Sequence, residues 1–493
     1  MFKSNQARLV AVILGISLAL RWLLILQGGQ YYFSDEQRYE TSRAFAKLAL
    51  EGNLSEAFSQ FFVAPEHLGF KIIGIVPAFF EQISRESLAS PALFFSLFST
   101  LNLYLIHRIS KRIGATERES LIALILAASS MSLLYYSRHL MPYDTAMTFG
   151  LLAIYTALAD RPTFKTSLAC GALGFACFIT YNGYWSLAAL GMLIHVFQSN
   201  SKISELIRKA ALTATGFILP AILLFILALF AGTNLLTEYR VFSTTVSQGS
   251  FDEGWSLPFE YFWHTEYLVF IALSVLSIFA VTHALKRRDS FPILWVGATA
   301  FLYASLIIPS VFLHSFVVYG RLARQMIPFF ILLAAGGIAS VEQSYPSGRI
   351  VTRIVLAIIL IQAIWNYKTS FELSYPREFA QQAMAQFPEF EFSEKRLAFG
   401  APTLCQNNGY IIENVKYFVT PPEPNPPVQG EILLSAPHPD NFLPYQYEGY
   451  TYEERQRLRE LQIEMRFYKA ESEFMTDTNP IWQTMKNCVV KEN

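Results

Sequence analysis

The stretch RLVAVILGISLALRWLLILQGGQYYFSDEQRYETSRAFAKLAL, residues 8–50, contains the two features that decide the fold. Its first part, 9–29, is a nearly unbroken apolar run of the length that a membrane-spanning helix needs, roughly 20 residues. An acidic pair, Asp35-Glu36, lies just beyond this run, and the rest has the pattern of an amphipathic helix that ends near 51–53. The segment therefore predicts a spanning helix followed by a helix at the membrane surface.

The composition of the whole chain agrees with this interpretation. Of its 493 residues 53% are hydrophobic and only 15% are charged, and Phe alone occurs 42 times. Charged residues usually make up about a quarter of a soluble protein, and disordered chains are polar and poor in aromatic residues. The chain is therefore expected to be a polytopic α-helical membrane protein. Lys plus Arg and Asp plus Glu both number 38, so net charge gives no reason to expect a nucleic-acid partner.

About eleven segments are long and apolar enough to be candidate spans. They lie at about 9–29, 91–108, 120–136, 144–159, 166–182, 184–198, 209–231, 265–285, 291–312, 326–341 and 350–367. A twelfth apolar segment, 68–83, is short and carries Lys71 near its start and Pro77 in its middle. Hydropathy alone leaves open whether 68–83 crosses.

The distribution of positive charge resolves this point, because cytoplasmic loops are enriched in Lys and Arg. If 68–83 does not cross, nearly every basic cluster falls on the same side as the N-terminus. These clusters lie at 109–119, 160–165, 199–209, 286–290 and 342–349. We therefore place the N-terminus inside and predict that 68–83 is an interfacial or half-inserted helix on the outer face. The outer segments are then 30–90, 137–143, 232–264, 313–325 and 368–493.

The tail, 368–493, has a different character from the transmembrane part, 1–367. It combines Pro-rich turns with an apolar strand-like run at 431–436 and a charged run at 451–465 that is predicted to be a helix, which together suggest a small α/β domain. Cys405 and Cys488 both lie in this outer tail, where a disulfide between them is plausible. The other two cysteines, Cys170 and Cys177, are interpreted as packing residues of a span.

Side chains capable of chemistry gather at the predicted outer ends of the spans. The acidic candidates are Asp35, Glu36 and Asp144, with Asp252-Glu253 as a competing pair in a polar loop. The candidate cations and histidines are His67, Lys71, Arg138, His139, Arg321 and Arg324. Arginine is well suited to bidentate phosphate binding.

Each of these candidates also has an ordinary structural interpretation. Asp35 can cap the helix that follows it, and Asp144 can pair with Arg138. The two arginines at 321 and 324 can extend toward lipid headgroups. His67 can be an interfacial histidine without a ligand.

The ordered set of motifs resembles the GT-C class of membrane glycosyltransferases, most closely the protein O-mannosyltransferase-like and lipid A aminoarabinose-transferase-like enzymes. The matching pieces are Asp35-Glu36 after the first span, EHLGFK at 66–71 where that family commonly has His-Pro-Pro, the turn LLYYSRHLMPYD at 133–144, and YGRLARQMIPFFILLAAGG at 319–337. The resemblance covers roughly residues 9–341.

This resemblance implies an inverting transfer of a sugar from a polyprenyl-phosphate donor on the outer face of the membrane. Asp35 would be the general base, with Glu36 and Asp144 as the other acidic candidates. His67, Lys71, Arg138, Arg321 and Arg324 would bind the donor and its phosphate. The resemblance implies no metal and no cofactor. A bacterial inner membrane with a periplasmic active site is the expected location, and the acceptor classes are protein, lipid A or core glycan, and cell-wall polysaccharide.

Two other functions remain open from the sequence. A transporter or flippase of a lipid-linked saccharide would have a similar composition, although such proteins usually show internal repeats and polar residues near the membrane midplane. A non-catalytic GT-C-like assembly subunit would keep the fold without the activity.

Overall fold

The structure, a computed structural model, describes residues 2–26, 30, 34–63, 65–83, 89–159, 163–197, 202–247, 255–287, 290–313, 320–371, 383, 386–387, 389, 405–407, 410–418, 429–437, 461–476 and 478. Asp35 and Cys405 are described by backbone alone. Their side chains, together with Asp252, Glu253 and Cys488, lie outside the described part of the chain, so the predicted disulfide and the competing acidic pair stay predictions.

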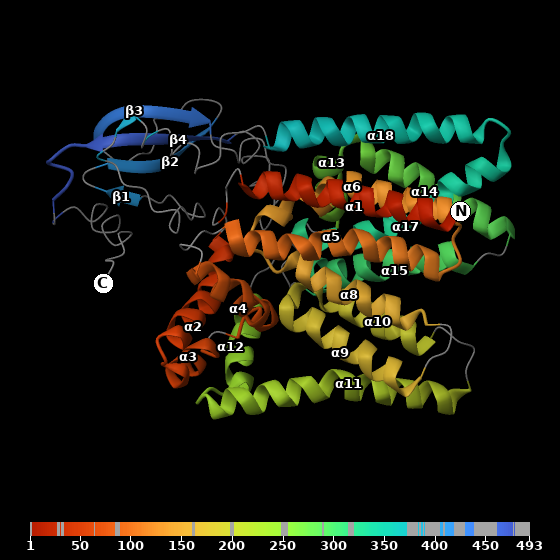
Figure 1. Cartoon of the computed structure of the whole chain (residues 1–493), viewed down its shortest axis with the longest axis horizontal. Coiled ribbons are helices and arrows are strands. Elements are labelled where there is room, and N and C mark those ends of the chain that lie inside the picture. Colours follow the sequence, from red (N-terminus) through yellow and green to blue (C-terminus); the bar gives the residue numbers. More distant parts are fainter. Residues whose placement is uncertain are drawn as a thin grey trace.

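Every segment predicted to span the membrane forms a helix. The helices are α1 (Phe2–Leu26), α5 (Ala89–Arg112), α6 (Glu117–Ser129), α8 (Tyr143–Ala157), α9 (Phe164–Thr180), α10 (Trp185–Phe197), α11 (Ile203–Phe230), α14 (Leu268–Arg287), α15 (Ser290–Ile307), α17 (Ile327–Ser344) and α18 (Gly348–Phe371). In Figure 1 their long members run side by side along the horizontal direction. The predicted polytopic α-helical fold is confirmed.

The number of full spans is smaller than the number of predicted segments. Seven of the described helices are long and apolar enough to cross a membrane, and an eighth qualifies if α6 and the bent segment after it count as one span. The helices α8, α9 and α10 contain only 15, 17 and 13 residues. Hydropathy identified these three as apolar, but each has fewer than the roughly 20 residues that a full span needs.

A group of short helices covers one end of the bundle. It contains η1 (Ser34–Tyr39), α2 (Glu40–Leu50), α3 (Leu54–Phe61), α4 (Leu68–Ile83) and α12 (Leu235–Ser247). We call α2, α3 and α4 the cap. In Figure 1 the cap and the sheet lie toward the left end of the bundle and the N-terminus lies toward the right end.

The helix α4 corresponds to the segment 68–83 that was predicted not to cross. With 16 residues it is shorter than a typical span, and it buries two charged side chains, Lys71 and Glu81. The Glu81 carboxylate lies 2.9 Å from Arg43 Nε of α2, so an ion pair joins the two cap helices. Burial of such charges fits packing against other helices of the protein, whereas contact with hydrocarbon would make them costly.

Small residues allow two of the long helices to pack backbone against backbone. A Cβ atom added at Gly171 of α9 would lie 2.0 Å from the Thr213 carbonyl of α11, and one at Gly216 would lie 2.2 Å from the Leu168 carbonyl. Such contacts are typical of helix pairs in membranes, where close packing replaces the hydrophobic effect between helices.

The described part of the tail is an antiparallel four-stranded sheet in the order β1-β2-β4-β3. Its strands are β1 (Cys405–Asn407), β2 (Tyr410–Phe418), β3 (Gly430–Pro437) and β4 (Leu461–Ala470). The predicted strand at 431–436 is therefore confirmed. Tyr410 and Phe467 stack across β2 and β4 with ring centroids 5.4 Å apart.

The helix predicted over 451–465 is wrong in its last part, because residues 461–465 begin β4. Apolar Leu461, Ile463 and Met465 alternate with polar residues, which is the period of a strand. This strand pairs with both β2 and β3, and that central position outweighs the helix propensity of the charged run.

We predict that the cap and the sheet lie on one side of the membrane, opposite the start of α11. Single cysteines at the exposed positions Ser59 and Glu471 should react with an impermeant thiol reagent in intact cells, and one at exposed Lys202 should not. The background should lack all four native cysteines. Labelling of Lys202→Cys with protection of Ser59→Cys would reverse the topology.

Candidate active site

The helix that begins at Glu117 breaks at Ser130, and a buried carboxylate holds this break. The segments on its two sides, α6 and the pair α7 (Met131–Leu134) with η2 (Tyr135–Arg138), are inclined by 71°. Glu266, the last residue of α13 (Leu257–Glu266), is fully buried. Its carboxylate accepts hydrogen bonds from Ser130 Oγ at 2.6 Å, Met131 N at 3.0 Å and Ser132 N at 2.8 Å. It therefore satisfies backbone donors that the break exposes.

A buried ion pair joins the beginning of α8 to the segment before α17. Arg324 is the first residue of η5 (Arg324–Met326), its side chain is 0% exposed, and it donates from Nη2 to Asp144 Oδ1 and from Nε to the Ser132 carbonyl. Its Nη1 is buried and has no hydrogen-bond partner among the described residues. The pair expected between Asp144 and Arg138 is thus wrong, because Arg324 takes that place, and Arg324 does not extend toward headgroups.

A second buried arginine, Arg21 of α1, fixes the same region. Its Nε donates to Ser99 Oγ at 2.9 Å and its Nη2 to the Leu133 carbonyl at 3.2 Å. Ser99 Oγ donates to the same Leu133 carbonyl at 3.0 Å. Arg21 therefore ties α1 and α5 to the segment after the break. No role for Arg21 or for Glu266 was predicted from the sequence.

Tyrosine rings form a continuous wall around the ion pair. Ring centroids are 4.9 Å apart between Tyr136 and Tyr143 and 4.8 Å apart between Tyr143 and Tyr181. The Arg324 guanidinium lies 5.4 Å from the Tyr136 ring centroid, and that of Arg321 lies 5.6 Å from the Tyr143 centroid. Arg321, in α16 (Gly320–Ala323), is only partly buried. One partly exposed arginine, Arg321, and one buried arginine, Arg324, thus lie beside neighbouring rings of this wall.

His67 belongs to this wall because α4 begins directly against the end of α9. Its ring centroid lies 4.9 Å from that of Tyr181, and its φ of 52° is in the left-handed region. A Cβ atom at Gly69 would lie 2.6 Å from Thr180 Oγ1 and 2.8 Å from Thr180 N. The Leu-Gly that follows His67, in place of Pro-Pro, therefore permits the close contact that positions this histidine.

Glu36 links the acidic segment to the turn at 137–143. Its carboxylate is fully buried, accepts from Leu140 N at 2.6 Å and lies 3.3 Å from His139 Nδ1. Arg138 is also fully buried, and its carbonyl accepts from Gln30 Nε2 at 3.3 Å. The structure thus brings η1 and this turn together, with Glu36 as the side chain that connects them.

Lys71 lies in the first turn of α4 and is almost completely buried. Burial lowers the pKa of its ammonium group to about 8, the nearby Arg38 lowers it further, and Glu66 opposes the shift. Arg38 Nε and the Glu66 carboxylate are 3.6 Å apart. Lys71 is therefore a buried cation at the cap, close to its ionisation point near neutral pH.

Within the described residues, no group of three His, Cys, Asp or Glu side chains could hold a metal ion. The arrangement of Asp144, Arg321 and Arg324 instead resembles an organic anion site, with arginine donors beside aromatic faces.

No protein-family model and no curated protein sequence matches the chain. Among solved structures, the chain is similar to ArnT from Cupriavidus metallidurans bound to undecaprenyl phosphate, with 14% identity, a TM-score of 0.51, and coverage of 76% of this chain and 68% of that chain. The apo structure of the same protein gives 12% identity, a TM-score of 0.47 and coverage of 77% and 68%. The likeness to the lipid-bound structure shows that the chain has a GT-C-like helical membrane fold.

We predict that Asp144→Asn lowers the free energy of unfolding by about 3–5 kcal/mol, because it leaves Arg324 buried without its counter-charge. Replacing both partners, as in Asp144→Leu with Arg324→Met, should recover much of this loss. Thermal unfolding in detergent measures both effects. Glu342→Gln is the matched control, since it removes the more exposed ion pair with Arg118 and should cost about 1 kcal/mol or less. An equal loss in the single and double variants would contradict a stabilising pair.

Proposed function

We propose that the protein is an inverting glycosyltransferase that moves a sugar from a polyprenyl-phosphate donor to an acceptor on the outer face of the membrane. The observation that carries the proposal is the spare Nη1 donor of buried Arg324, next to the partly exposed Arg321 and a wall of tyrosines. The GT-C fold and the undecaprenyl phosphate bound in the ArnT structure support it.

The leaving group in this reaction is a lipid phosphate, which needs positive charge as the bond to the sugar breaks. Arg321 would make the direct contact, since it is accessible and held over Tyr143. Arg324 would supply its spare N–H and a fixed positive field from below. Lys71 would add charge from the cap, and His67 would contact the donor headgroup, while Arg138 holds the turn between them.

The nucleophile of the acceptor must lose a proton, and a carboxylate at the outer end of the first span suits this role. Asp35 remains our proposed base. Glu36 is less suited, because both of its oxygens already face hydrogen-bond donors within the protein, and we assign it a positioning role. Asp144 is held by Arg324, so we assign it to the orientation of that arginine.

The tyrosine wall would hold the sugar ring, since aromatic faces pack against the apolar C–H face of a sugar. The transition state resembles an oxocarbenium ion, as in glycoside hydrolysis, and the electron-rich faces of Tyr143 and Tyr181 would lie beside its positive charge. Residues 1–367 would form the catalytic membrane domain and 368–493 an outer domain. The expected setting is a bacterial inner membrane with the site on the periplasmic face, and the acceptor would be a glycan, lipid or protein.

We expect the purified protein to release sugar from a radiolabelled polyprenyl-phosphate sugar, and Asp35→Asn to slow this release by about 100- to 10,000-fold. Donor affinity should change little, because the substitution removes the base and keeps the shape. Glu36→Gln is the matched comparison and should act mainly on stability. Movement of intact donor across a vesicle bilayer without release of sugar would replace our proposal by a transport function.

We also predict that donor binding weakens above about pH 8. The lowered pKa of Lys71 means that its ammonium form is present below this pH and is lost above it. The donor phosphodiester does not titrate there, so its dissociation constant should rise by up to about tenfold per pH unit. Lys71→Arg keeps its charge and should remove this dependence. Equal loss of affinity in both proteins above pH 8 would show that another group titrates.

A further inference from the structure

A cavity lies at the end of the bundle opposite the cap. Its volume is about 160 Å³, and it is enclosed by the turn between α5 and α6, the beginnings of α6 and α15, and the ends of α14 and α17. In Figure 1 these helix ends gather near the N-terminus. It is therefore separate from the candidate active site.

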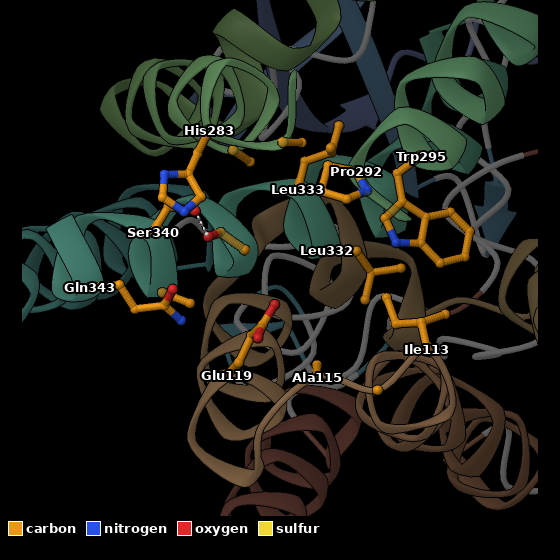
Figure 2. A pocket seen from close by; sticks show the side chains of 15 residues that line it. Ile113, Ala115, Glu119, His283, Pro292, Trp295, Leu332, Leu333, Ser340 and Gln343 are labelled. Carbon is orange, nitrogen blue, oxygen red and sulfur yellow. Dashed lines mark hydrogen bonds between the residues drawn. The ribbon is translucent and has the colours of Figure 1, made fainter. Parts of the chain in front are cut away.

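Figure 2 shows that polar side chains gather on part of this cavity's wall. They are Glu119, His283, Ser340 and Gln343, and they face a more apolar side that includes Ile113, Leu332 and Trp295. The cavity thus has a polar part and an apolar part.

Trp295 provides a hydrogen-bond donor with no acceptor. Its side chain is 1% exposed, and its Nε1 is buried without a hydrogen-bond partner among the described residues. An indole N–H can only donate, and a buried donor without an acceptor carries a free-energy cost. In Figure 2 the indole nitrogen lies on the ring edge that faces the other lining residues. A ligand in this cavity is expected to offer an oxygen acceptor to Trp295.

The opposite wall favours a ligand that donates hydrogen bonds. Ser340 Oγ donates to the Gly336 carbonyl at 2.8 Å, so its own oxygen can still accept. Glu119 contributes a carboxylate, which when ionised only accepts. None of the residues that line the cavity is a Lys or Arg. His283 is the basic side chain among the lining residues, and the Glu119 carboxylate and the Ser340 hydroxyl offer acceptor oxygens to a ligand that donates hydrogen bonds.

Two cations near the cavity, Lys111 and Arg118, each pair with an acidic residue that does not line it. Lys111 Nζ lies 2.6 Å from Glu117, and Arg118 Nη2 lies 2.5 Å from Glu342. A metal is not suggested, because no group of three His, Cys, Asp or Glu side chains within the described part of the chain could hold one. A cavity of this size holds about five water volumes at roughly 30 Å³ each, which admits a small headgroup and excludes a nucleotide or a whole sugar chain.

We propose that this cavity binds a primary ammonium group on a short chain that carries an oxygen acceptor, as in the ethanolamine headgroup of a membrane lipid. The ammonium group would donate to Glu119 and Ser340, and the oxygen would accept from Trp295 Nε1. A bound headgroup would hold the end of α17 against the beginning of α6. The far ends of these two helices carry Arg324 and the break at Ser130, so the ligand would support the site from the other side of the bundle.

The experiment compares the protein in nanodiscs of phosphatidylethanolamine and of phosphatidylcholine by native mass spectrometry. We expect retained phosphatidylethanolamine and little phosphatidylcholine, because a quaternary ammonium has no N–H to donate. Glu119→Gln should reduce retention by about tenfold or more, as a charge-assisted hydrogen bond is lost, and Trp295→Phe by about threefold to tenfold. Glu342→Gln, on the same helix end but outside the cavity, should retain the lipid.

A second arm separates the lipid from a free amine. If millimolar ethanolamine raises the thermal stability of delipidated wild-type protein and does not raise that of Glu119→Gln, the site accepts the free amine as well. Equal retention of both lipids, or retention unaffected by either cavity variant, would overturn the proposal, as would a cavity that holds water alone. These readouts do not involve sugar transfer, so they are independent of the proposed function.

Discussion

The ion pair between Asp144 and Arg324 is the interaction around which the cap end of the bundle is organised. Burying two charges costs several kcal/mol per ion unless each is paired and hydrogen-bonded. The two charges pair with each other, and the Ser132 carbonyl accepts a further hydrogen bond from Arg324. Asn102 of α5 and Thr148 of α8 both donate to the backbone carbonyl of Asp144 at 2.9 Å, which fixes the start of α8. Ser132 is available for this contact because the helix is broken there, and the break persists because Glu266 satisfies its exposed donors.

The cap depends on a second set of buried charges. The ion pair between Arg43 and Glu81 holds α2 against α4, and Ser42 Oγ donates to the Lys71 carbonyl at 2.8 Å. These contacts fix the start of α4, and with it His67 and Lys71. The cap therefore positions His67 and Lys71 at the tyrosine wall. The ion pair with Asp144 positions a different cation there, Arg324. Each group is fixed by contacts that do not involve a substrate.

The sequence predicted the helices well because apolar length is a local property that hydropathy measures directly. The segment 68–83 forms one helix of 16 residues, and its placement on the outer face, which rests on the charge of distant loops, stays a prediction. The prediction from sequence failed at 461–465, where a strand's two neighbours come from segments far along the chain. The partner of Asp144 was wrong for a similar reason. Arg138 is near in sequence, but Arg324 is 180 residues away, and only the packed helices bring it close. No sequence pattern pointed to Glu266, because its contacts with residues 130–132 form only when α13 packs against the broken helix.

The helices α8, α9 and α10 are short compared with the thickness of a bilayer. At a rise of 1.5 Å per residue, helices of 13 to 17 residues are about 20–26 Å long, compared with a hydrocarbon thickness of about 30 Å. Tyr143, Tyr181 and Trp185 stand at the ends of these helices. Each of the three helices is therefore several ångströms too short to join the two headgroup levels of a bilayer. Where the opposite helix ends lie at headgroup level, a lipid-borne phosphate in the proposed reaction would have to descend slightly from its usual plane to reach these rings.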